Sequence, residues 1–241
     1  MTSNEQQNLV HAPRAVPPRV GSSVRAVDDV AGLSAVFEDG VNVVALSRKV
    51  GVTILDEAQV ALARPSFRLL TSIAPSEGPA ALGDQMACLP QLAAEIHFWT
   101  EVLAELTGCE LVGVRLARLE AAMCPRFHVD KVTVRVVSTF AGSGTEYIPE
   151  EEVDRRWLGH AALGANDEVS GLLRPGARIR QAEAGDLVFL KGEAWPENAG
   201  RGAVHRSPWA SSTRPRLVMT LDPLESINHD REASRGPRSR R

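Results

Sequence analysis

Two histidines and one aspartate are the residues of this sequence whose types and spacing best suit metal chemistry. His128 and Asp130 stand in the run Arg126-Phe-His-Val-Asp130, just before a stretch rich in valine. Because side chains alternate between the two faces of a strand, we expect His128 and Asp130 to leave the same face. An imidazole and a carboxylate placed in this way can chelate one metal ion.

A third ligand has to come from another strand, and His205 is the best candidate. Two histidines and one carboxylate make a ligand set that leaves positions open on an octahedral Fe(II) for a co-substrate and dioxygen. We expect no catalytic group beyond these metal ligands. If Cys124 reached the same ion, the four residues would instead form a closed tetrahedral site of the kind that zinc prefers.

The same alternation predicts which neighbours share the face of the ligands. It places three valines beside them as an apolar wall: Val132, Val134 and Val136. It places three polar residues on the opposite face: Lys131, Thr133 and Arg135.

Further charged and aromatic residues are candidates for the lining of a pocket near the ion. These candidates are Arg126, Glu146, Lys191, Glu193, Trp195 and Arg206. The two arginines flank predicted ligands and could bind an anionic substrate or pair with an acid outside the site.

The elements that must position these residues change in type along the chain. Apolar spacing of three and four predicts helices over residues 56–63 and 84–106, the second stopped by Gly108. Short stretches rich in Val, Leu and Thr, separated by glycine turns, predict strands. The predicted strands cover residues 41–46, 67–73, 111–119, 129–140, 177–183, 187–190 and 216–221. Residues 154–162 are expected to form a helix or an inserted lid.

This order indicates an α+β protein in which a β-barrel or sandwich carries helices from the N-terminal part of the chain. Residues 1–25 are rich in proline and polar side chains and are expected to be a disordered arm. Residues 26–227 form a single predicted domain. Residues 228–241 are a predicted disordered basic tail, with five arginines against two acids.

Composition excludes several classes of protein. The chain has 241 residues, of which 44% are hydrophobic and 24% charged, so it is neither disordered throughout nor collagen-like. No apolar run is long enough to cross a bilayer and no secretory signal is visible, so the expected location is the cytoplasm without membrane association. A net charge of −3 makes nucleic acid an improbable partner. Three widely spaced cysteines do not suit a disulfide scaffold.

The second half of the chain resembles the Fe(II)/2-oxoglutarate-dependent oxygenases, a cupin-like superfamily. The segments that carry the resemblance are Gly185-Asp-Leu-Val-Phe-Leu190, His205-Arg206 and Arg216-Leu-Val-Met-Thr-Leu221. The resemblance implies a double-stranded β-helix (jelly-roll) core. It also implies Fe(II) as the cofactor, with 2-oxoglutarate as co-substrate.

Carried over by position, the resemblance makes His128, Asp130 and His205 the metal ligands. It makes Arg216 the residue that binds the far carboxylate of 2-oxoglutarate, a role that suits the planar fork of a guanidinium. The sequence departs from the superfamily pattern two residues later, where Val218 stands in place of the usual Ser or Thr.

A longer resemblance, over about residues 41–222, is to a bacterial family catalogued as domain of unknown function 1826. Its motifs here are Met123-Cys-Pro-Arg-Phe-His-Val-Asp-Lys-Val132, Gly144-Thr-Glu146, Gly185-Asp186, Lys191-Gly-Glu193, Trp195 and His205-Arg-Ser-Pro208. This family names no reaction. It implies an association with zinc homeostasis, and therefore Zn(II) as the alternative metal.

Three hypotheses follow from the sequence. The first is a non-haem Fe(II) oxygenase acting on a small-molecule or peptidic substrate. The second is a zinc-binding accessory or sensor protein without oxygenase activity, with Cys124 at the ion. The third is a metal-free cupin-like binding module in which Arg126, Arg206 and Arg216 recognise an anion.

Overall fold

The computed structural model describes residues 22–224. The basic tail, and the first 21 residues of the predicted N-terminal arm, lie outside this range. Residues 22–25, which the sequence assigns to the arm, belong to the folded body, because the first strand, β1, spans Val24–Val27. Among the described residues, no helix is long and apolar enough to cross a membrane.

The predicted helices and strands are present with changed boundaries, and three short strands that the sequence did not predict are added, at Val24–Val27, Glu146–Ile148 and Val204–Arg206. The strands after β1 are β2 Val43–Leu46, β3 Arg68–Ile73, β4 Leu111–Leu119, β5 Val134–Ala141, β6 Glu146–Ile148, β7 Arg180–Gln181, β8 Leu187–Lys191, β9 Val204–Arg206 and β10 Arg216–Leu224. The α-helices are α1 Val52–Ala63 and α2 Pro90–Thr107. Short 3₁₀ helices cover Ala31–Phe37, Pro75–Glu77, Pro79–Leu82, Asp84–Met86, Glu150–Glu152, Arg155–Trp157 and Gly159–Ala162.

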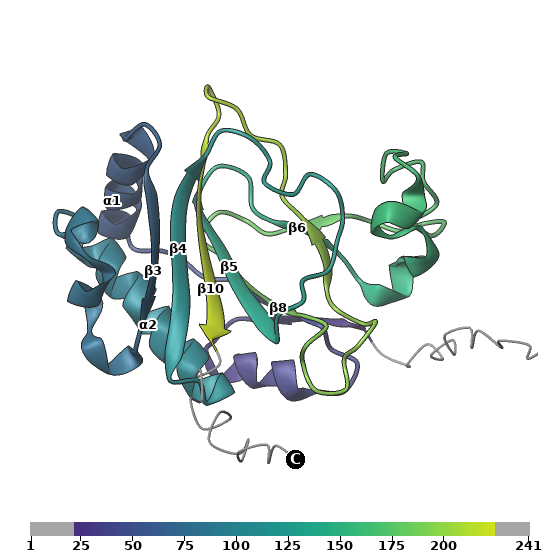
Figure 1. The fold of residues 1–241 in the computed structure, drawn as a ribbon, viewed down its shortest axis with the longest axis horizontal. Helices are drawn as coiled ribbons and strands as arrows, with labels where there is room; N and C mark the ends of the chain where they lie inside the picture. The colour runs from purple at the N-terminus through teal and green to yellow at the C-terminus, as the bar shows by residue number, and fades with distance from the viewer. Residues whose placement is uncertain (1–21, 225–241) are drawn as a thin grey trace, which may run out of the picture.

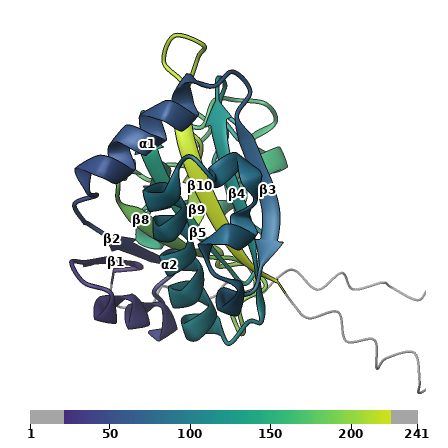
Figure 2. The same cartoon turned by 90° about the vertical axis from the view of Figure 1, so that its left-hand side faces the viewer.

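The described strands form two sheets of different size. The large sheet has the order β1-β2-β8-β5-β10-β4-β3, and the small sheet has the order β7-β6-β9. All neighbours pair antiparallel except β1 and β2, which are parallel. In Figure 1 the two helices lie on one side of the large sheet and the small sheet lies on the other. Figure 2 shows α1 and α2 in front of the strands that they cover.

From β4 onward, the chain passes repeatedly between the two sheets. It runs from β4 in the large sheet to a bridge at His128, which pairs with His205 of the small sheet. It then returns to β5, crosses to β6 and β7, and returns to β8. Finally it crosses to β9 and ends in β10. Each strand that carries a predicted site residue is therefore held by neighbours distant in sequence.

Buried apolar residues form three clusters that follow this layering. The first lies between the large sheet and the helices and includes Ile96, Leu103, Leu116, Val136 and Met219. The second lies between the two sheets and includes Val43, Val137, Tyr147, Leu190 and Val218. The third lies on the outer face of the small sheet, beneath residues 149–174, and consists of Phe127, Ile148, Val153, Leu172 and Val204. The central strands are buried on both faces, which is why they read as nearly continuous apolar runs.

Helix α2 starts later than its apolar spacing predicts. Residues 84–86 form a separate 3₁₀ turn, and Pro90 occupies the first turn of α2, where a missing N–H costs nothing. The predicted end is correct, because Gly108 adopts a left-handed conformation with φ 69° and its N–H is bonded to the carbonyl of Ala104. The segment predicted as a helix or lid is instead a series of 3₁₀ turns.

Candidate metal centre

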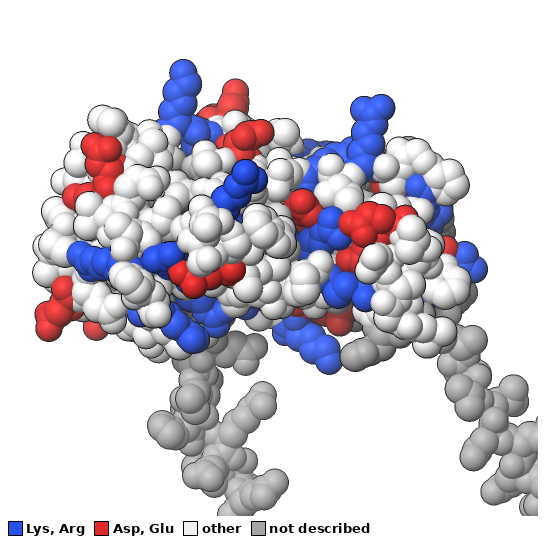
Figure 3. Space-filling view, turned by 90° about the horizontal axis from the view of Figure 1, so that it is seen from above, with Lys and Arg blue, Asp and Glu red and all other residues white. Residues whose placement is uncertain are grey.

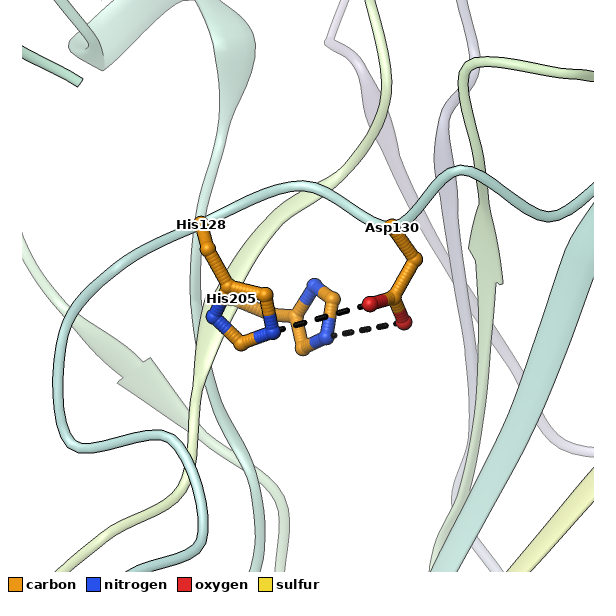
Figure 4. Close-up of side chains that lie close together, drawn as sticks. All are labelled: His128, Asp130 and His205. Carbon is orange, nitrogen blue, oxygen red and sulfur yellow. Dashed lines mark ion pairs between the residues drawn. The ribbon is translucent and has the colours of Figure 1, made fainter. Parts of the chain in front are cut away.

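The structure brings His128, Asp130 and His205 together, although they come from a bridge, a loop and a strand. One ligand atom from each lies within 4.8 Å of the others. The Nε2 atom of His128 is 3.6 Å from Oδ1 of Asp130, and Nε2 of His205 is 3.4 Å from Oδ2. Figure 4 shows both imidazole rings directed toward the carboxylate. These distances are longer than good N–H···O hydrogen bonds. The three side chains therefore face a common position that a metal ion could occupy.

The tautomers of both histidines are fixed by their own backbone. Nδ1 of His128 lies 3.0 Å from the carbonyl oxygen of Arg126, and Nδ1 of His205 lies 3.0 Å from that of Ala203. A carbonyl oxygen only accepts hydrogen bonds, so each Nδ1 must carry the proton. Each Nε2 then presents a lone pair toward Asp130. This is the tautomer that a metal-binding histidine uses, with its other nitrogen held by a backbone carbonyl.

The backbones of the two histidines hold each other in register. The N–H of His128 donates to the carbonyl of His205 at 3.0 Å, and the N–H of His205 donates back at the same distance. This pair continues the small sheet beyond β9, so His128 is tied to the strand that carries its partner. His205 is buried and His128 is half-buried.

Asp130 stands in a turn that is attached to the end of β8. The N–H of Glu193 donates to the carbonyl of Asp130 at 2.9 Å, and the N–H of Gly192 donates to Thr133 at 2.8 Å. At position 192 a Cβ atom would lie only 1.9 Å from the carbonyl oxygen of Val132. Only glycine allows the two backbones to approach so closely. Gly192 of the Lys191-Gly-Glu193 motif thus supports the turn from which Asp130 projects.

Because residues 129–133 do not form a strand, the predicted faces of Val134, Val136 and Arg135 were wrong, although His128 and Asp130 do converge as predicted. β5 starts at Val134, and the alternation of side chains is not carried through the preceding turn. Val134 and Val136 belong to the cluster against the helices, away from the ligands. Arg135 lies on the face of Asp130 and contacts it. The apolar wall that the sequence places beside His128 is therefore not formed by these valines.

The carboxylate of Asp130 is ionised and binds the guanidinium of Arg135. Nη1 of Arg135 donates to its Oδ2 at 2.7 Å, while the rest of that guanidinium binds Asp222 of β10 at 2.7 and 2.8 Å. Burial opposes ionisation of Asp130, but the neighbouring groups, including the positive charge of Arg135, outweigh it and lower its pKa to about 2. Burial, then the neighbouring His205, lowers the pKa of His128, which keeps that imidazole neutral.

Arg216 is buried between the two sheets without an acid partner. It is only 2% exposed. Its Nε donates to the carbonyl of Ser143 at 2.6 Å, and its terminal nitrogens donate to Oγ of Ser207 at 2.9 Å and Oγ1 of Thr139 at 3.3 Å. No carboxylate of the described residues lies within 4.0 Å of the guanidinium. Desolvation by burial lowers the pKa of Arg216 to about 10, so it still carries its charge at neutral pH.

The position of Arg216 relative to the histidines follows from Ser207. This serine is two residues beyond His205, which corresponds to about 7 Å along an extended chain. The hydroxyl groups that accompany the guanidinium come from Ser207 and Thr139. Val218, two residues after Arg216, packs in the apolar cluster between the sheets.

The other pocket candidates lie elsewhere. Arg206 pairs with Glu146 at 2.6 Å and with Glu168 at 2.8 Å, so both members of that pair are engaged away from the ligands. Arg126 pairs with the buried Asp167 at 2.8 Å. The side chains of residues 126 and 206 thus pack on the outer face of the small sheet.

Lys191 and Trp195 are neighbours of the N-terminal 3₁₀ helix. Nζ of Lys191 lies 5.0 Å from the centre of the Trp195 ring and donates to the carbonyl of Glu38. Trp195 also packs against Phe37. Glu193 is half-buried beside Gly202, and its backbone N–H supports Asp130. Cys124 is exposed and is not part of the ligand group found among the described residues.

Sequence reasoning missed the groups that hold the ligands in place. Arg135 was assigned to the wrong face, and Asp222 and Asp167 were not singled out. Asp167 accepts hydrogen bonds from Nε of Arg126 and the N–H of Phe127, both at 2.8 Å, across about 40 positions. A strictly buried aspartate between two ligand-flanking arginines carries no local sequence signal. Only the three-dimensional pairing reveals it.

A family model described as "Protein of unknown function (DUF1826)" matches residues 27–222, which is most of the chain. The chain belongs to this family. The motifs that suggested the DUF1826 resemblance, from Met123 to Pro208, fall inside the matched region, so that prediction is confirmed. No curated protein matches this chain.

Several solved structures are distantly similar to this DUF1826 protein. The dioxygenase for auxin oxidation from rice is 14% identical, with a TM-score of 0.47, over 85% of this chain and 84% of the other. The corresponding enzyme 1 from Arabidopsis thaliana, in complex with 2-oxoglutarate, is 13% identical, with a TM-score of 0.48, over 85% and 94%. A prolyl-4-hydroxylase from Pseudomonas putida is 16% identical, with a TM-score of 0.43, over 82% and 98%.

Proposed function

We propose that this protein is a non-haem Fe(II) oxygenase that uses 2-oxoglutarate and is built on a double-stranded β-helix. The observation that carries the proposal is the convergence of two imidazoles and one carboxylate beside a buried arginine that has no acid partner. The strand order supports the fold. β4, β10, β5 and β8 are adjacent in one sheet, and the His128 bridge, β9, β6 and β7 are adjacent in the other, with the chain alternating between them.

The donor atoms fit a metal ion of this kind. Both Nε2 atoms carry lone pairs, because both Nδ1 atoms donate to backbone carbonyls. Asp130 supplies a charged oxygen, and backbone hydrogen bonds tie all three residues to the neighbouring strands. Two nitrogens and one oxygen on one side of the ion leave the other side open, as the facial set of non-haem Fe(II) oxygenases requires.

Arg216 supports 2-oxoglutarate as the co-substrate. A buried guanidinium that lacks a carboxylate is costly unless a ligand supplies one. The two hydroxyls beside it, from Thr139 and Ser207, can add hydrogen bonds to the same anion. Its hydrogen-bond partner Ser207 lies about 7 Å along the chain from His205, a spacing that suits a dicarboxylate with one end at the ion and the other at Arg216.

The division of tasks among the residues follows from these contacts. Bound Fe(II) with 2-oxoglutarate would supply an oxidant derived from dioxygen. His128, Asp130 and His205 would hold the ion, and Arg135 keeps one oxygen of Asp130 occupied so that the other faces the ion. Val137, Tyr147 and Val218 belong to the apolar cluster that packs between the two sheets.

The closed zinc site of the second hypothesis requires a fourth protein ligand, and none of the described residues provides it. Cys124 is exposed, and only its backbone carbonyl, which accepts from Ser207 at 2.9 Å, is tied to the ligand-bearing strands. A closed tetrahedral site of four protein ligands is therefore not formed. Three ligands do occur in catalytic zinc sites, so the metal itself has to be measured.

The test combines metal content with turnover. Protein purified without added metal and then loaded anaerobically with Fe(II) is expected to bind one ion per chain. With dioxygen, it should convert 2-oxoglutarate to succinate above the background without protein. Asp130→Ala should lose both properties, while Cys124→Ala, the matched control, should keep both.

Two results would overturn the proposal. One is stoichiometric zinc that resists chelation and disappears in Cys124→Ala, which would favour the accessory or sensor protein. The other is no binding of 2-oxoglutarate by the iron-loaded protein in calorimetry. Anion binding that persists in His128→Ala without any metal would favour the metal-free module.

A further inference from the structure

Arg115 lies on the inner face of the large sheet. Its side chain forms no hydrogen bond or ion pair with any residue that the structure describes. Its neighbours Val112, Val114 and Leu116 are fully buried against the helices, so the odd-numbered residues of β4 face the other way. Leu119, with the same parity, packs against the cluster between the sheets. Arg115 therefore projects into the space that also holds the metal-ligand group.

No acid among the described residues forms an ion pair with Arg115. Its Nε is buried without a hydrogen-bond partner, and it forms no ion pair with a described residue. The acid on this face of β10 is Asp222, which accepts hydrogen bonds from Nε and Nη2 of Arg135 at 2.7 and 2.8 Å. The residue directly opposite Arg115 on β10 is Thr220, which offers only a hydroxyl.

The face beside Arg115 is open and partly apolar. On the other side, β3 pairs Leu70 directly with Arg115, and Leu70 is 62% exposed. Arg68 and Ser72, which have the same parity on β3, are also exposed. The small sheet therefore leaves this edge of the inner face uncovered, with an apolar side chain next to a cation. On the face seen from above in Figure 3, basic and acidic side chains are interspersed among uncharged ones.

Arg115 and the metal-ligand group are separated by a distance that suits a small molecule. In the sheet register, Arg115 pairs with Thr220, and Thr220 pairs with Val137, two residues beyond Arg135. Two strand spacings and two residues along β5 place the Cα atoms of Arg115 and Arg135 about 12 Å apart. Arg135 is bonded to Asp130, so both ends of such a molecule would have a defined partner.

We propose that Arg115 binds the carboxylate of a small substrate whose apolar part lies on Leu70. A guanidinium fork binds a carboxylate with two parallel charge-assisted hydrogen bonds, and the hydroxyl of Thr220 is adjacent. One unpaired cation matches one negative charge. The identification of the bound molecule as a substrate rests on the proposed oxygenase function, whereas the binding of a carboxylate at Arg115 does not require a metal.

The test uses phenylacetate as the probe, titrated into metal-free full-length protein and followed by ligand-observed NMR. Wild type is expected to bind it, and Arg115→Gln should weaken binding at least tenfold. Phenylacetamide, which has the same shape without the charge, should bind at least tenfold more weakly. Arg118→Gln is the matched control. It lies on the same strand, pairs with Glu120 and should leave the affinity unchanged.

Further arms separate this proposal from the proposed function. Arg216→Gln should leave phenylacetate binding intact, which excludes capture at the other buried arginine. Arg115→Gln should keep the metal stoichiometry and 2-oxoglutarate affinity of wild type, so loss of either would mark a structural defect and contradict the assignment. Equal phenylacetate affinity in wild type and Arg115→Gln, or no binding to wild type, overturns it. Tighter binding of phenyl phosphate than of phenylacetate overturns the assignment to a carboxylate.

Discussion

The two faces of the large sheet differ in chemistry although the same strands supply both. On the outer face, Leu116, Val136 and Met219 pack against α1 and α2 in a continuous apolar layer. On the inner face, apolar residues such as Val137 and Val218 stand beside charged ones, and Arg115 and Arg135 alternate in sequence with the buried Leu116 and Val136. A shift of register by one residue would exchange the two sets.

This difference indicates a division of tasks. The outer face can be filled with any well-packed apolar side chains, and it provides most of the stability. The inner face carries groups that are costly to bury, and they are retained where they hold a ligand or a partner group. Stability and chemistry are thus separated by the alternation of a strand, and substitutions on either face should show it.

The largest expected effect comes from the outer face. Leu116→Ala removes a side chain that is 0% exposed and should lower the free energy of unfolding by about 2–5 kcal/mol, measured by urea denaturation. The Fe(II) affinity of the protein that remains folded should stay within threefold of wild type. A parallel loss of metal affinity would show that the two faces are not independent.

The next effect concerns the ligands. His205→Ala should reduce Fe(II) affinity at least a hundredfold in anaerobic titration, because it removes one of three donors. The stability of the metal-free protein should change little. The matched control is His97→Gln on α2, whose imidazole binds the carbonyl of Pro75 on the helical side. It should keep the metal affinity and lose stability instead.

A substitution at the end of β8 should affect both properties. Gly192→Ala forces a Cβ atom to within 1.9 Å of the carbonyl oxygen of Val132, so the turn carrying Asp130 must move. We expect the free energy of unfolding, measured by thermal denaturation, to fall by about 1–3 kcal/mol, and metal binding to become weaker. Gly51→Ala is the control, because its φ is −60° and the nearest atom to a Cβ is 3.8 Å away. An unchanged metal affinity in Gly192→Ala would show that the geometry of this turn does not affect metal binding.

The smallest effect is expected one contact further from the ion. Asp222→Asn weakens the ion pair that holds Arg135. It should lower the metal affinity about tenfold, which is the lower end of the range for residues that orient metal ligands. Asp154→Asn, which removes a similar exposed pair with Arg156, should have no effect on calorimetric metal binding. Equal metal affinities of Asp222→Asn and Asp154→Asn would show that Arg135 does not position Asp130 for metal binding.

The sequence predicted the architecture better than the details of the site. Strand β4 was predicted over the residues that form it, because a strand buried on one face and flanked by turn residues has a strong local pattern. The convergence of His128, Asp130 and His205 was inferred from ligand types and from a family resemblance, and the structure brings them together.

The predictions failed where contacts across the fold decide the outcome. Arg135 was assigned to the wrong face because the strand parity was extended through residues 130–133, which Gly192 and Ala194 hold as a turn. Asp167 and Asp222 act over long separations in sequence and leave no periodic signal. Glu146 and Arg206 were candidates for the pocket, yet they neutralise each other outside it.

The reciprocal backbone bonds between His128 and His205 have a consequence for how an ion would arrive and leave. The chain entropy of bringing these two rings together is lost during folding, so capture of a cation need not order either segment. Repeated stripping and reloading should therefore leave the far-ultraviolet circular dichroism unchanged. The metal site would be preformed, and its occupancy would depend on the concentration of free metal ion.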